Sequence, residues 1–225
     1  MSKADRRKDK ALALARTEER KRVTLRVLQA CSDTATRTLA ELAATGVVPS
    51  CRPGCAHCCR IEIPISRAEA EVIVDWLHAN RSADELEAIR DRLRAWLVWY
   101  RTEYHALIAS GVSRPDAFAK HAPLCAVNVD GSCSIYPVRP ALCRNFHVSS
   151  PVSECDPATS TREPDIMFEV MRAVRPHILE LQDFVAGQGG DYFATVHLIS
   201  EWLAHLLEVE REPWQGSPRL DLGRG

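Results

Sequence analysis

Clustered cysteines are the residues of this chain whose type and spacing could do chemistry. The 225-residue sequence contains nine cysteines, and eight of them fall into two groups. The first group follows a C-x3-C-x2-C-C pattern, and the second spans residues 125–155. Thiolate sulfur is a soft ligand that selects zinc, copper(I) or iron–sulfur clusters. The candidate metal ligands are Cys51, Cys55, Cys58, Cys59, Cys125, Cys133, Cys143 and Cys155.

The spacing of these cysteines favours an iron–sulfur cluster over a zinc ribbon. A structural zinc site often uses two C-x2-C pairs, and this chain has one, Cys55 and Cys58. Iron–sulfur sites, of which 4Fe–4S is the type expected here, tolerate uneven spacing, whereas zinc remains the alternative cofactor. Adjacent Cys58 and Cys59 could serve one multinuclear centre or two sites. One cluster with spare thiols, a cluster plus a zinc, or two sites all stay open.

The expected compartment also favours metal ligands over disulfides. The basic N-terminus is not followed by the apolar core of a signal peptide, and no stretch is apolar enough for a membrane helix. We therefore expect a cytoplasmic protein without a membrane partner. Thiols stay reduced in that compartment, so clustered cysteines there are better explained as ligands.

The second group contains an ordered motif. Residues 133–146 read CSIYPVRPALCRNF, a C-x-I-Y-x-x-R-P-x-x-C-R-x-F string that follows the C-x3-C-x2-C-C run. Together the two motifs closely resemble the YkgJ-like cysteine-cluster family, described as a zinc- or iron-chelating domain. The cysteine-rich part of flagellin lysine N-methylases is similar. The resemblance covers about residues 51–155 and implies metal binding through an iron–sulfur cluster, but it does not define a reaction.

The resemblance also implies which residues surround the metal. The first four cysteines fall on the first motif, Cys125, Cys133 and Cys143 fall on the second, and Cys155 is a further member. Three residues near Cys143 are candidate cofactor-binding residues, because they could offset thiolate charge, hydrogen-bond to sulfur or exclude water. The alternative for the arginines is a salt bridge or a clamp on loop carbonyls. These residues are Tyr136, Arg139 and Arg144.

Other cysteine and histidine residues near the motifs have more ordinary interpretations. Cys31 stands alone on an early helical segment and is expected in the core. His57, His121 and His147 lie near cysteines and could each supply a nitrogen ligand, but thiols are already plentiful. No catalytic residue is assigned by the sequence.

The elements that must position the cysteines are mostly helical. Two S-x-x-E capping boxes, at residues 66–69 and 82–85, predict helices that end near Ala79 and Ala109. Asp130-Gly131 predicts a turn between two cysteines. A third helix is expected after Asp165. The fold class is therefore mainly α, a small helical bundle with an irregular cysteine-rich metal-binding lobe.

The ends of the chain differ from its centre in charge. Residues 1–26 hold ten Lys or Arg against four Asp or Glu, a net of +6, so the rest carries −7 of the total of −1. We predict a basic N-terminal helix or tail over 1–30, one metal-binding domain over 31–210 and a disordered tail over 211–225. A buried stripe of Leu25, Leu28, Leu39 and Leu42 is expected over residues 24–45, and a final helix over 193–209.

Three functional hypotheses follow from these patterns. The leading one is an iron–sulfur protein with a redox or cluster-handling role, which includes an iron–sulfur oxidoreductase. The second is a structural zinc module that presents a partner-binding helical surface, and the third is a methylase-like protein-modifying enzyme. An unidentified protein or redox partner is expected, whereas the near-neutral total charge disfavours nucleic acid.

Overall fold

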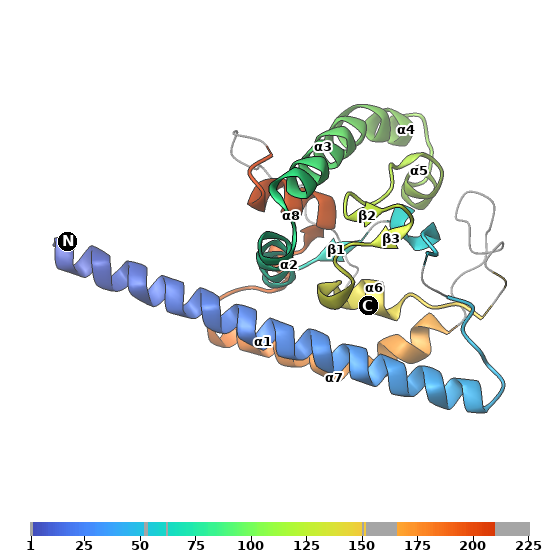
Figure 1. Cartoon of the computed structure of the whole chain (residues 1–225), viewed down its shortest axis with the longest axis horizontal. Coiled ribbons are helices and arrows are strands. Elements are labelled where there is room, and N and C mark those ends of the chain that lie inside the picture. Colours follow the sequence, from blue (N-terminus) through green and yellow to red (C-terminus); the bar gives the residue numbers. More distant parts are fainter. Residues whose placement is uncertain (1, 52–53, 62, 150, 152–165, 210–225) are drawn as a thin grey trace.

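A long pair of helices forms one side of the molecule. The computed structural model describes residues 2–51, 54–61, 63–149, 151 and 166–209. Helix α1 (Lys3–Ala44) packs along α7 (Met167–Gly187), and Figure 1 shows them side by side. The pair is antiparallel, because Arg26 bonds Glu180 while Thr34 contacts His177. The residue-30 boundary of the predicted domains falls inside α1, and the predicted tail 211–225 lies outside the described residues.

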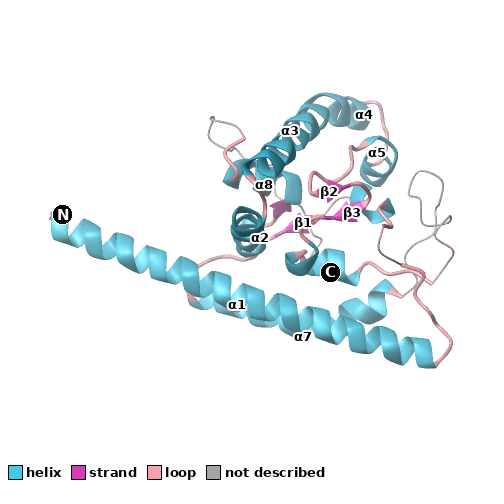
Figure 2. Cartoon of the chain, viewed as in Figure 1, coloured by secondary structure: helices cyan, strands magenta, loops and turns pink. Residues whose placement is uncertain are grey.

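The remaining elements form a second layer over this pair (Figure 2). It contains α2 (Arg67–Asn80), α3 (Ala83–Trp99), α4 (His105–Ala109), α5 (Arg114–His121), α6 (Ala141–Asn145) and α8 (Ile199–Leu206). A π-helical turn, η2 (Tyr100–Tyr104), joins α3 to α4, and short 3-10 turns are η1 (His57–Arg60), η3 (Tyr136–Val138) and η5 (Phe193–Thr195). The mainly α fold class is confirmed.

Two short strand pairs link distant parts of the chain. Strand β1 (Pro64–Ile65) pairs antiparallel with β4 (His197–Leu198), and β2 (Asn128–Val129) pairs with β3 (Ser132–Cys133). The β2–β3 turn is the predicted one: Asp130 has φ 50° and Gly131 has φ 78°, the left-handed backbone that a tight hairpin turn requires.

Local capping signals fixed the helix starts correctly. Ser66 and Ser82 each accept a hydrogen bond from the backbone of Glu69 and Glu85, and both capping boxes are reciprocal. The helices behind them bury a common apolar face, together with residues from α1, α7 and α8. The largest fully buried side chains include Leu28, Ile73, Leu77, Ile89, Leu93, Leu181 and Leu203.

Two local expectations were wrong. The basic N-terminal segment is helical, which is one of its two predicted forms, and it continues through α1, but the buried stripe of α1 runs through Val27 and Cys31 and leaves Leu25 46% exposed on another face. The last helix is shorter than predicted, because residues 197–198 are extended to pair with β1. Asp165, after which a third helix was predicted, lies outside the described residues, and α7 begins at Met167.

Candidate metal centre

Cysteines from three separate segments meet in the second layer. Cys58 and Cys59 lie on the turn η1, Cys125 precedes β2, Cys133 is on β3, and Cys143 is on α6. The N–H of Cys125 donates to the carbonyl of Cys59 at 2.9 Å, which joins the first cysteine run directly to the second. Segments that are far apart in the sequence therefore lie next to each other in the fold.

The thiols of these segments influence one another electrostatically. The pKa of Cys143 is raised by burial first and then by three neighbouring thiols. Cys58 is influenced in turn by Cys143 and Cys55. We call the interacting set the thiol cluster, and its members are Cys55, Cys58, Cys59, Cys125, Cys133 and Cys143.

The remaining cysteines do not belong to the thiol cluster as described. The Cys51 sulfur lies 4.0 Å from the carbonyl of Phe146, beside the segment that leaves α6. Cys155 lies outside the described residues. Cys31 is fully buried in the core, as predicted. Within the described ranges, no three His, Cys, Asp or Glu side chains are arranged so that they could hold a metal ion.

Backbone and amide donors point at the sulfurs of the cluster. The N–H of Val127 donates to the Cys125 sulfur, and the N–H of Ile135 donates to the Cys133 sulfur. The Asn128 side-chain amide donates to the Cys59 sulfur at 3.3 Å. Each bond favours the charged thiolate over the thiol. The β2–β3 hairpin thus supplies or orients donors for three sulfurs.

The pKa values of the adjacent thiols Cys58 and Cys59 are shifted in opposite directions. The Cys58 thiol donates to the Cys59 sulfur, and this bond, with the Asn128 bond, lowers the pKa of Cys59 to about 6 despite burial. The pKa of Cys58 is raised by that same bond and by burial. Burial also raises the pKa of Cys125 to about 12. Metal binding at these thiols must therefore release protons.

The two arginines of the second motif have different contacts. Arg144 is 5% exposed and donates to the carbonyls of Arg139 and Pro137, both at 2.8 Å, and to the hydroxyl of Ser32 on α1. It clamps the loop before α6, which is the structural alternative given above. The guanidinium of Arg139 instead lies 4.2 Å from the ring centre of Tyr136, which is 57% exposed.

Three unpartnered polar atoms belong to residues within four positions of Cys143 in the sequence. The Nε of Arg139, the Oδ1 of Asn145 and the Nδ1 of His147 are buried and lack a hydrogen-bond partner within the part of the chain that the structure describes. The Arg139 charge also lowers the pKa of Cys133 and Cys143, against the larger effect of burial. A buried N–H donor beside thiols fits an anionic sulfur centre, because such a centre would supply the missing acceptor.

The histidines near the motifs are not equivalent. The Nε2 of His147 lies 2.8 Å from the carbonyl of Arg144, and burial lowers the pKa of the ring. A neutral ring that donates through Nε2 leaves Nδ1 as a free acceptor, which is the tautomer of many metal-binding histidines. His121 is exposed at the end of α5, and His57 lies on η1.

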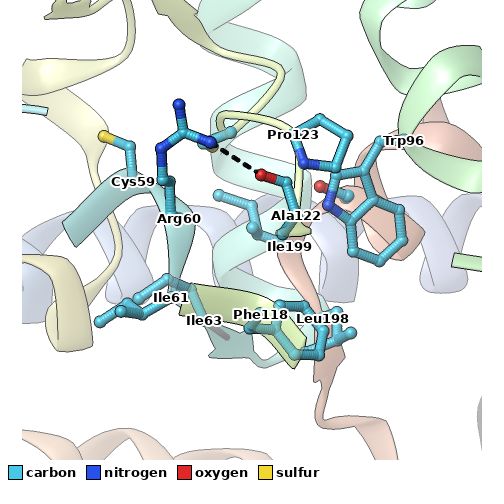
Figure 3. A pocket seen from close by; sticks show the side chains of 12 residues that line it. Cys59, Arg60, Ile61, Ile63, Trp96, Phe118, Ala122, Pro123, Leu198 and Ile199 are labelled. Atoms are coloured by element: carbon cyan, nitrogen blue, oxygen red, sulfur yellow. Dashed lines mark hydrogen bonds between the residues drawn. The ribbon is translucent and has the colours of Figure 1, made fainter. Parts of the chain in front are cut away.

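One side of the thiol cluster borders a small apolar pocket (Figure 3). Its volume is about 20 Å³, which is room for about one water molecule. Cys59 and Cys125 line it together with Trp96, Phe118 and several aliphatic residues, and Arg60 closes one edge by donating to the carbonyl of Ala122 at 3.0 Å. The apolar walls explain why burial is the largest cause of the raised pKa of Cys125.

Sequence reasoning missed several residues that hold the lobe. Arg92 on α3 donates to the carbonyl of Ala126 at 2.7 Å, and Arg81 donates to the carbonyl of Ser134 at 2.6 Å. Both carbonyls lie next to a cysteine. The sequence assigned no role to these arginines, because no local signal distinguishes them from other helical arginines. Asn128 had a weak signal, because it precedes the predicted turn.

The chain's similarity to known proteins was also tested. No protein-family model matches it, and neither the curated proteins nor the solved structures contain a significant match. Among the described helices, none is both long and apolar enough to cross a bilayer.

Proposed function

We propose that this chain is a metal-binding cysteine-cluster protein whose thiols hold an iron–sulfur cluster, with a redox or cluster-handling role. The observation that carries the proposal is the thiol cluster itself. Six cysteines from three segments interact, and three of their sulfurs accept hydrogen bonds from preplaced N–H groups. Ordinary buried cysteines have no need of such donors.

The ligands would come from the thiol cluster, with Cys51 and Cys155 as the remaining candidates from the motifs. An iron–sulfur cluster supplies reversible one-electron chemistry when bound. The chain's own groups would tune that chemistry through hydrogen bonds to sulfur and through solvent exclusion. Asn128 and the hairpin N–H groups provide the bonds, Arg139 provides positive charge, and the apolar pocket limits water.

The number and spacing of the thiols support iron–sulfur over zinc. A structural zinc ion is satisfied by four ligands, and the described lobe alone contains six interacting thiols. The resemblance of the two motifs to the YkgJ-like family supports the same assignment. Zinc is the competing outcome of the metal measurement.

Metal and sulfide quantification tests this proposal. The full-length protein should be produced in iron-replete cells, purified without air, and measured for iron, zinc and acid-labile sulfide, with EPR before and after dithionite reduction. We expect iron and sulfide in similar amounts and an EPR signal in one redox state. A colourless protein with one zinc per chain and no sulfide would contradict the iron–sulfur assignment, and a protein without bound metal would contradict the function itself.

A further inference from the structure

A buried carboxylate connects helix α2 to the helix that carries Cys143. Glu69 is 4% exposed, and its Oε2 accepts hydrogen bonds from the N–H and the hydroxyl of Ser66, both at 2.9 Å. Its Oε1 accepts a third bond, at 3.1 Å, from the backbone N–H of Ala141. The Tyr192 hydroxyl also bonds to this pair. One carboxylate thus serves the start of α2 and the start of α6.

The bond to Ala141 falls where α6 has no cap of its own. Pro140 is the N-cap residue of α6, and it has no side chain that can accept a hydrogen bond. The first N–H groups of a helix require an external partner, and a carboxylate is the most favourable one. Because α6 spans only Ala141–Asn145, its orientation depends on this contact and on the Arg144 clamp.

Cys143 is the third residue of this short helix, so the place of its sulfur follows from that of the first turn. We propose that Glu69 is a positioning residue of the thiol cluster, which sets the position of Cys143 relative to Cys125 and Cys133 through the N–H of Ala141. A carboxylate can accept from Ser66 and from Ala141 at the same time, which an alanine cannot. A test that measures bound metal rests on the proposed function, whereas a test that measures the reactivity of the Cys143 thiol does not.

The neighbouring Glu71 provides a matched control. It lies on the same helix, it is 7% exposed, and it is also a hydrogen-bonded carboxylate. Its partners, however, are Arg20 and Arg67, at 2.8–2.9 Å, which lie outside the cysteine lobe. Substitution of either glutamate should lower stability, but only substitution of Glu69 should alter Cys143.

The same hydrogen bond can be removed from its donor side. Ala141→Pro deletes the N–H at the first position of α6, where proline is tolerated. Pro140 already has φ −55° and ψ 156°, the backbone that a residue before proline prefers. Ser66 donates to the other carboxylate oxygen of Glu69, so this variant removes no donor from that side.

The test is site-resolved alkylation of the full-length protein after anaerobic metal removal. Iodoacetamide labelling is quantified at each cysteine by peptide mass spectrometry in wild type, Glu69→Ala, Glu69→Gln, Ala141→Pro, Glu71→Ala and Glu71→Gln. In Glu69→Ala and Ala141→Pro, we expect Cys143 to react about tenfold faster, which is the size of one lost hydrogen bond. Glu69→Gln has one acceptor oxygen for donors on both sides of the carboxylate, so Cys143 should react there at a rate between those of wild type and Glu69→Ala. Both Glu71 variants should match wild type at Cys143.

Two results would overturn the inference: unchanged Cys143 labelling in both Glu69→Ala and Ala141→Pro, or an equal change in the Glu69 and Glu71 variants. If Glu69→Ala does not fold, Ala141→Pro decides the question alone. In protein isolated with its metal, iron per chain should fall in Glu69→Ala and not in Glu71→Ala. Wild-type protein without metal would defeat the proposed function, yet the alkylation rates would still decide the role of Glu69.

Discussion

The side-chain amide of Asn128 donates to the sulfur of Cys59 at 3.3 Å, across 69 positions of sequence. Asn128 is 7% exposed and belongs to the β2–β3 hairpin, whose other strand carries Cys133. The hairpin therefore does more than present its own cysteine. It stabilises the thiolate of a cysteine from the first motif, and so it couples the two motifs chemically as well as spatially.

Replacement of single cysteines should separate ligands from spare thiols. We expect Cys55→Ser, Cys58→Ser and Cys143→Ser each to lose most of the bound metal, because these thiols belong to the interacting cluster. Cys31→Ala is the control, since Cys31 is buried in the α1 core and should keep its metal content. Metal per chain in anaerobically purified variants is the measurement, and full retention in all three serine variants would refute the ligand assignment.

The reactivity of Cys59 should depend on pH in the neutral range. Because its pKa is lowered to about 6, the thiolate is present above that pH and is lost as the pH falls through it. The alkylation rate at Cys59 in metal-free protein should therefore rise with a midpoint near 6, while Cys125, with a pKa near 12, stays slow. Asn128→Leu should move the Cys59 midpoint upward, and an unchanged midpoint would contradict the Asn128 bond.

Metal affinity should rise with pH over a wider range than the Cys59 titration. The pKa values of Cys58, Cys125 and Cys143 are raised, so binding at these sulfurs must displace protons up to alkaline pH. Competition with a chelator whose own pH dependence is known measures the effect. An affinity that levels off just above pH 6 would show that Cys59 is the main thiol that loses a proton on binding.

Substitution of the two motif arginines, Arg144 and Arg139, should affect different properties of the protein. Arg144→Leu should lower the free energy of unfolding by about 3 kcal/mol, because it leaves the carbonyls of Arg139 and Pro137 and the hydroxyl of Ser32 without their donor. Arg139→Leu should change stability by less than about 1 kcal/mol, since its main contact is the exposed Tyr136 ring. Arg139→Leu should instead lower the affinity of the thiol cluster for metal. Urea unfolding and chelator competition distinguish the two, and similar stability losses would contradict the different roles.

Metal removal should loosen the cysteine lobe selectively. The hairpin strands and α6 are only two and five residues long, so few backbone bonds hold residues 125–145. Hydrogen exchange there should accelerate after chelation, whereas the α1–α7 pair should remain protected because its core does not depend on the thiols. Uniform acceleration over both regions would indicate that metal holds the whole fold.

The parts of the fold that depend on neighbouring residues were predictable. The capping boxes at Ser66 and Ser82 and the turn at Asp130 follow from side chains within three positions of one another. Cys31 was correctly placed in the core. The structure joins Cys125 to Cys59 through the backbone, whereas the shared metal site of the two motifs remains a prediction.

The parts that depend on distant residues were not predictable. The pairing of β1 with β4 joins two two-residue segments, which are too short for a periodic pattern. The contact between Glu69 and Ala141 uses a backbone N–H, which leaves no mark in the sequence. Leu25 was misplaced because several leucines share α1, and only its packing against α7 and α2 selects the buried face.

The pairing of Pro64 with Leu198 also sets an order of events during synthesis. Helices α2 and α3 and the cysteine lobe are complete in sequence long before β4 and α8 leave the ribosome, yet α8 packs on both of these helices. Contacts across so large a sequence separation close late and fold slowly. The nascent chain must therefore keep apolar surface on α2 and α3 exposed until its last described helix arrives, which makes that interval its most aggregation-prone stage.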